Sequence, residues 1–107
     1  DTFVPHDVPE ATLKDIQKEC NKVRGLSEAY LFRKVTEDSG HIYVLAFLTG
    51  YSWYAGRNDK HVSVAWADLS DMTTLPAPLG FIALDLHHIE LLPKIKAVSG
   101  SLIYKRN

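Results

Sequence analysis

Side chains able to do chemistry are most closely spaced in FIALDLHHIELL, residues 81–92, where Asp85, His87, His88 and Glu90 fall within six positions. Histidines combined with carboxylates serve as metal ligands and as general acids and bases. Successive side chains of a strand point to opposite faces, so Asp85 and His87 would share one face and His88 would lie on the other. The sequence therefore offers two converging groups, Asp85 and His87, as weak candidates for a metal site.

A metal centre needs at least one more ligand from elsewhere in the chain. The other histidines are His6, His41 and His61. A small metal-dependent hydrolase that uses Asp85, His87 and one distant histidine is thus the alternative functional hypothesis. The leading interpretation is a polar strand end followed by a helix, with Glu90 favoured near the positive end of the helix dipole. Under that interpretation we expect no catalytic residue, no metal and no cofactor.

Cys20 is the one cysteine of the chain, which rules out an internal disulfide and a cysteine-rich zinc site. It falls on the apolar stripe of an expected helix, where a thiol behaves as a small hydrophobic side chain rather than as an activated nucleophile. The sequence contains neither a G-x-S-x-G nucleophile motif nor a glycine-rich phosphate loop followed by Lys and Ser or Thr. The chain is therefore expected not to be an enzyme.

The segment GYSWYAGRND, residues 50–59, is expected to be a loop rich in aromatic side chains. Tyr, Trp and Arg dominate the energetics of protein interfaces, so the loop is a candidate contact surface. A structural alternative has Trp53 covering the core beneath the loop. A histidine at the expected strand end is a further contact candidate. The candidate interaction residues are Tyr51, Trp53, Tyr54, Arg57 and His88.

Length and composition indicate one domain over residues 1–107, with 46% hydrophobic and 23% charged residues. The formal net charge of −1 and the scattered basic residues argue against nucleic acid or an anionic membrane as a partner. The longest apolar run, Val44–Leu48, is too short to span a bilayer. The chain starts at Asp1 rather than at a methionine, and we expect it to be a fragment of a longer, two-domain protein.

The first half of the chain predicts one helix and a hairpin. After an extended lead-in over residues 1–8, apolar residues at helical spacing predict a helix over residues 9–23. Alternating and β-branched residues predict strands over 27–35 and 41–49, joined by the polar turn TEDSG. The second strand is almost continuously apolar, which indicates a central position covered on both faces.

The second half predicts two helices and two strands. Residues 59–72 fit either a helix or a strand, and the helix is favoured, with Trp66 in the core. Residues 73–80 are expected to be an irregular Pro- and Gly-containing connector, followed by a strand over 81–86. Residues 89–98 predict a helix, and the final strand is expected over residues 101–105. The order α-β-β-α-β-α-β predicts an α+β domain with helices packed on one four-stranded, mostly antiparallel sheet.

Several phrases resemble the C-terminal domain of the SseB family, the "enhanced serine sensitivity" proteins of bacteria. The phrases are Pro9 with its following helix, EAYLF at 28–32, LPAPLGFIALDL at 75–86 and the closing LIYKRN at 102–107. One departure is the proline that the family usually places before the closing aromatic pair, where this chain has Ser101 and Leu102 instead. The resemblance spans nearly the whole chain and rests mostly on packing and turn residues.

The resemblance implies a function through contact rather than through catalysis. The family has no catalytic motif whose residues could be carried over, and its members also contain an N-terminal domain. The sequence therefore predicts a non-enzymatic interaction or regulatory domain of a bacterial cytoplasmic protein, with a protein partner or a second copy of itself as the binding partner.

Overall fold

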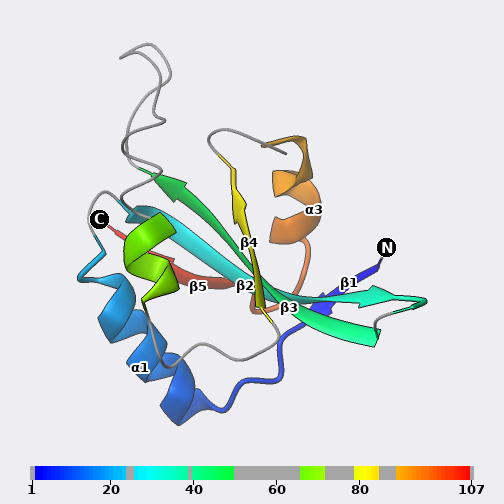
Figure 1. The fold of residues 1–107 in the computed structure, drawn as a ribbon, viewed down its shortest axis with the longest axis horizontal. Helices are drawn as coiled ribbons and strands as arrows, with labels where there is room; N and C mark the ends of the chain where they lie inside the picture. Colours follow the sequence, from blue (N-terminus) through cyan, green and yellow to red (C-terminus); the bar gives the residue numbers. More distant parts are fainter. Residues whose placement is uncertain are drawn as a thin grey trace.

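The computed structural model describes residues 2–23, 26–38, 40–49, 66–71, 79–84 and 89–106. A single sheet contains five strands: β1 (Thr2–Pro5), β2 (Leu26–Thr36), β3 (Gly40–Thr49), β4 (Leu79–Ala83) and β5 (Leu102–Lys105). The helices are α1 (Glu10–Cys20), a helical segment over 66–70, and α3 (Leu92–Lys96), which follows the 3₁₀ turn η2 (Ile89–Leu91). Figure 1 shows the β2–β3 hairpin crossing the whole molecule.

The sheet is mostly antiparallel, as the sequence predicted. β2 pairs antiparallel with β1, β3 and β5, and β4 lies parallel to β3. β1 and β5 share one edge of β2: β1 pairs with Phe32–Val35, whereas β5 pairs with Glu28–Tyr30. One outer edge of the sheet is therefore made from the two ends of the chain, and β4 forms the other.

The fifth strand, β1, corrects the predicted four-stranded sheet. The sequence predicted only an extended lead-in there, because four residues ending in a proline carry little strand signal. Pro5 can be the last residue of β1 because an edge strand does not need a hydrogen bond from every backbone N–H. The Phe3 ring packs on the Phe32 ring at a centroid distance of 4.6 Å, which attaches β1 to the sheet through a contact distant in sequence.

The first helix is shorter than predicted but buries the expected stripe. Pro9 has ψ 148°, outside the helical range, so the helix begins at Glu10 and ends at Cys20. Ile16 and Cys20 are fully buried, and Val23 joins the same core from the turn that follows. The spacing of these apolar positions thus identified correctly which face of the helix is buried.

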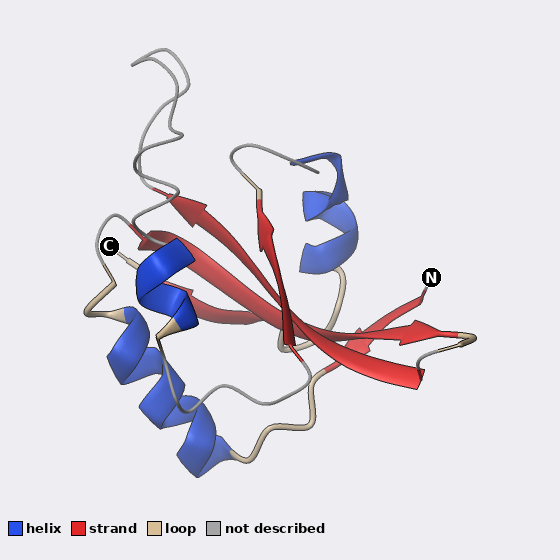
Figure 2. Ribbon diagram, in the orientation of Figure 1, coloured by secondary structure: helices blue, strands red, loops and turns tan. Residues whose placement is uncertain are grey.

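Two hydrophobic clusters lie on opposite faces of the sheet, so the domain has three layers (Figure 2). Alternation along β2 divides the side chains: Ala29 and Leu31 face α1, whereas Tyr30 and Phe32 face α3. Leu45 and Phe47 of β3 join the α1 side, and Val44 and Ala46 join the α3 side. β3 is thus central and covered on both faces, as its apolar sequence predicted.

Two boundaries and one burial prediction need correction. β4 runs from Leu79 to Ala83, two to three residues earlier than the predicted strand 81–86, and Gly80 lies inside it. An edge strand tolerates Gly80, although a glycine contributes no side chain to the packing of the sheet. Trp66 is not a core residue but is 38% exposed, with its ring against Phe47 and Phe81 at centroid distances of 5.9 and 5.7 Å.

The ambiguous segment 59–72 is helical over 66–70, where Leu69 is fully buried in the α1-side core, and its remaining residues except Asp71 lie outside the described part. Near the C-terminus the helix proper begins at Leu92 next to Pro93, as predicted. Among the described residues, no helix combines the length and the apolar character that crossing a membrane requires.

Candidate functional site

The interaction candidates from the sequence lie outside the described residues. This holds for the aromatic loop residues Tyr51, Trp53, Tyr54 and Arg57, and for His88. Asp85 and His87 lie outside them as well. The described strand β4 ends at Ala83, before both of them.

Among the described histidines, His41 lies far from the end of β4. His41 stands near the beginning of β3, whereas β4 ends beside Phe47 at the other end of that ladder. Six residues of strand separate these two points, which is about 20 Å. In addition, no group of three His, Cys, Asp or Glu side chains among the described residues could hold a metal ion.

His6 is engaged through both ring nitrogens. The Val8 N–H donates to Nδ1 at 3.3 Å, so Nε2 carries the proton and donates to the Gly100 carbonyl oxygen at 3.1 Å. Gly100 has a φ of 73°, a left-handed conformation that glycine adopts without strain. His6 thus joins the segment after β1 to the turn before β5, and it has no free nitrogen for a metal.

Cys20 is a structural residue, as predicted. Its side chain is fully buried in the α1-side core. Burial raises the pKa of the thiol to about 12, and the nearby Glu19 carboxylate adds to this effect. A thiol with such a pKa is not a nucleophile near neutral pH, because it holds its proton.

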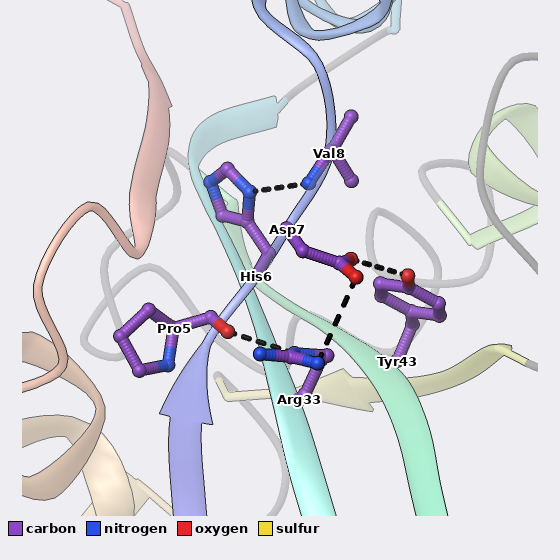
Figure 3. A network of polar contacts seen from close by, with 6 residues as sticks. All are labelled: Pro5, His6, Asp7, Val8, Arg33 and Tyr43. Atoms are coloured by element: carbon purple, nitrogen blue, oxygen red, sulfur yellow. Dashed lines mark hydrogen bonds and ion pairs between the residues drawn. The ribbon is translucent and has the colours of Figure 1, made fainter.

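A polar network that the sequence did not reveal joins the β1–α1 linker to the sheet (Figure 3). The Tyr43 hydroxyl donates to Oδ1 of Asp7 at 2.5 Å, and an Arg33 guanidinium nitrogen lies 3.7 Å from Oδ2 of Asp7. Arg33 Nε also donates to the Pro5 carbonyl oxygen at 2.8 Å. We call Asp7, Arg33 and Tyr43 the Asp7 network.

The titration of the Asp7 network follows from these contacts. The hydrogen bond from Tyr43 has the largest effect and lowers the pKa of Asp7; desolvation opposes it, and the positive charge of Arg33 lowers the pKa further. The same hydrogen bond raises the pKa of Tyr43. At neutral pH the carboxylate is therefore charged and matched by a donor and a cation, an arrangement that fastens the linker rather than one awaiting a ligand.

An open groove of about 530 Å³ lies between α1 and β5. Its helix side is formed by exposed polar side chains one turn apart, and its strand side includes the buried Ile103 and the half-buried Tyr104. The volume is within the range of ligand sites, although this groove is open rather than enclosed. The lining residues are Lys14, Gln17, Lys18, Asn21, Ile103, Tyr104 and Lys105. We call this the α1–β5 groove.

Arg106 lies at the end of the groove next to the C-terminus of α1. Its guanidinium donates to the carbonyl oxygens of Asn21 at 3.1 Å and Val23 at 3.2 Å, carbonyls that follow the helix C-terminus. Arg106 Nε also donates to the Tyr104 hydroxyl at 3.0 Å, and that hydroxyl donates to Oδ1 of Asn21 at 3.3 Å. These bonds fix α1 against β5, so the spacing of the groove walls is set by the fold.

Charge distinguishes the α1–β5 groove from its surroundings. Lys14, Lys18 and Lys105 line it, all three are exposed, and no carboxylate is among the lining residues. None of the three has an ion-pair partner among the described residues. A signal was present in the sequence, because Lys14 and Lys18 are four apart and Lys105 precedes Arg106, but nothing in the sequence showed that the chain end lies beside the first helix.

The comparisons with known proteins leave the family open. No family model, no curated protein and no solved structure matches this chain.

Proposed function

We propose that this chain is a non-enzymatic protein-interaction domain and that the α1–β5 groove is one of its contact surfaces. The observation that supports this most directly is the groove itself. It combines three lysines without an ion-pair partner among the described residues with walls fixed by the Arg106 hydrogen bonds. Preformed walls reduce the entropy lost when a partner binds.

The resemblance to the C-terminal domain of the SseB family supports the same proposal and adds a setting in the bacterial cytoplasm. The polar clusters of the described residues are consistent with it. His6 hydrogen-bonds to the backbone, and the members of the Asp7 network bond to one another and to the backbone. The aromatic loop with Tyr51, Trp53, Tyr54 and Arg57 remains a second proposed contact surface.

Site-specific photocrosslinking tests this proposal. The photoreactive residue p-benzoylphenylalanine replaces Gln17 in the groove, or Lys96 on α3 as a matched control on the opposite face of the sheet. In cells of origin, we expect a discrete protein adduct from position 17 and none from position 96. A third position, Trp53, reports on the aromatic loop.

Adducts at position 53 alone would support the interaction function but would assign the contact surface to the aromatic loop instead of the groove. Equal, diffuse labelling at all three positions would contradict the proposed function, because a specific interface labels its own positions selectively.

A further inference from the structure

The outer edge of β5 presents unpaired backbone groups beside the groove. β5 is attached to β2 by hydrogen bonds from Arg106 N–H to Ser27 O at 2.8 Å and from Leu31 N–H to Ser101 O at 2.7 Å. Backbone groups of successive residues in an antiparallel strand point alternately toward and away from the partner strand. Because Arg106 points toward β2, the N–H and C=O of Lys105 point away from it. Among the described residues, no strand pairs with that side of β5.

The two faces beside this edge differ in chemistry. On the α1 face lie Lys14 and Lys18 of the α1–β5 groove. On the other face lies Leu102, which pairs with Tyr30 across the strands and is 47% exposed. Paired residues of neighbouring strands point to the same face of a sheet, so Leu102 projects on the α3 side. A strand added here would have one face against cations and the other beside an exposed apolar side chain.

The charge on the α1 face selects an anionic occupant. Lys14 and Lys18 stand one helical turn apart along the groove on the α1 face. Lys105 lines the groove from β5, but it pairs with Glu28, which is on the same face as Tyr30, so its side chain projects on the α3 side. Glu10 stands one turn before Lys14, so the positive potential on the α1 face is greatest toward Lys18. Two cations on this face favour carboxylates and disfavour a second copy of this chain, which would bring two more cations to the same place.

From these observations we propose that an extended segment of a partner protein, alternating acidic and apolar residues, adds to β5 as a further strand. Its backbone pairs with Lys105, its carboxylates meet Lys14 and Lys18, and its apolar side chains lie near Leu102. Strand addition of this kind draws affinity from main-chain hydrogen bonds and specificity from alternate side chains. The inference deepens the proposed function and depends on it.

A synthetic peptide tests the inference directly. The probe is a fluorescein-labelled octapeptide of alternating Glu and Val, and its control is the alternating Lys and Val octapeptide of equal length. Fluorescence anisotropy with the whole chain should show saturable binding of the Glu peptide and none of the Lys peptide. Binding should weaken as salt is raised, because exposed charges are screened within about 8 Å at physiological ionic strength.

Charge-reversal variants locate the site. The double variant Lys14→Glu with Lys18→Glu should weaken binding by at least about tenfold, since two attractions become repulsions. The matched control Lys96→Glu changes an exposed lysine on α3, across the sheet from the groove, and should change affinity less than about twofold. Circular dichroism of each variant confirms that the fold is retained.

Amide hydrogen exchange separates strand addition from simple charge attraction. The Lys105 amide should exchange rapidly in the free chain and at least about tenfold more slowly with saturating Glu–Val peptide, since it gains a hydrogen bond. An unchanged Lys105 exchange rate at saturation would overturn strand addition, even if the lysine variants weaken binding.

Three other results would overturn the inference. Equal binding of an octathymidylate would assign the groove to polyanions in general, and equal binding of phosphatidylserine vesicles would assign it to a membrane surface. A dimer in sedimentation that the Lys14→Glu and Lys18→Glu variant abolishes would assign it to a second copy. If the peptide fails while position 17 still crosslinks a protein, the proposed function stands and strand addition alone is wrong.

Discussion

The Asp7 network and the α1–β5 groove both place charged side chains at the surface, yet their charges are arranged in opposite ways. In the Asp7 network each ionised group has a partner: the carboxylate receives the Tyr43 hydrogen bond and faces Arg33, which also donates to Pro5. In the groove three cations gather with no carboxylate in the lining. A matched network stabilises a connection within the chain, whereas gathered like charges oppose one another until an external anion arrives.

The largest expected effect concerns the floor of the groove. Ile103→Ala should reduce the free energy of unfolding by about 3 kcal/mol, because it leaves a cavity in the α1-side core where Ile103 is 3% exposed. Urea denaturation followed by circular dichroism measures the change. The neighbouring variant Leu102→Ala, at 47% exposure, should stay within about 0.5 kcal/mol of the original chain. Equal losses in both variants would show that the floor is not part of the core.

The Asp7 network should contribute measurably to folding. Arg33→Ala removes the hydrogen bond to the Pro5 carbonyl and the cation beside Asp7, and should cost about 1 kcal/mol of unfolding free energy. The same urea experiment measures this, with Lys96→Ala as a control that removes an exposed cation from α3. If both variants unfold alike, the comparison fails, because the network would then be as dispensable as an isolated surface charge.

Acid should weaken the Asp7 network. The folded pKa of Asp7 lies below its ordinary value of 3.8, mainly through the hydrogen bond from Tyr43. This stabilisation is fully present above pH 3.8 and is lost as the pH falls through the lowered folded pKa. Asp7→Asn should therefore flatten the dependence of unfolding free energy on pH between about 5 and 2. An unchanged slope would mean that Asp7 is not stabilised as a carboxylate.

The smallest expected effect on stability belongs to the groove lysines. Changing Lys14, Lys18 and Lys105 together to Gln should leave the unfolding free energy within about 0.5 kcal/mol, or raise it slightly by relieving repulsion. Thermal unfolding at low salt is the most sensitive measurement, because repulsion is then least screened. A loss above about 1 kcal/mol would assign these lysines a structural role.

Local sequence predicted those parts of the fold that depend on neighbouring residues. The stripe through Ile16, Cys20 and Val23 identified the buried face of α1, and the apolar run of β3 identified a central strand. The buried thiol of Cys20 followed from the same stripe. Such patterns suffice because hydrophobic periodicity directly reflects which face of an element is removed from water.

Pairing across long sequence separations was not predictable. β1 carries too few residues for a strand signal and is held by Phe32 and its neighbours in β2, about thirty positions later. The end of β4 at Ala83, earlier than predicted, likewise depends on its parallel pairing with β3. The residue at which a strand ends depends on its register with the partner strand rather than on its own residues alone.

By itself, the sequence determined a mixed helix-and-strand fold, its buried stripes and a buried thiol. Only the tertiary structure brought Lys105 at the end of the chain beside Lys14 and Lys18 near its beginning, and only it matched Asp7 with Arg33 and Tyr43. The physical reason is range. Burial is encoded locally because the apolar face of each element avoids water. Which charged side chains lie close together depends instead on which strands are neighbours, and that is decided only when the whole sheet forms.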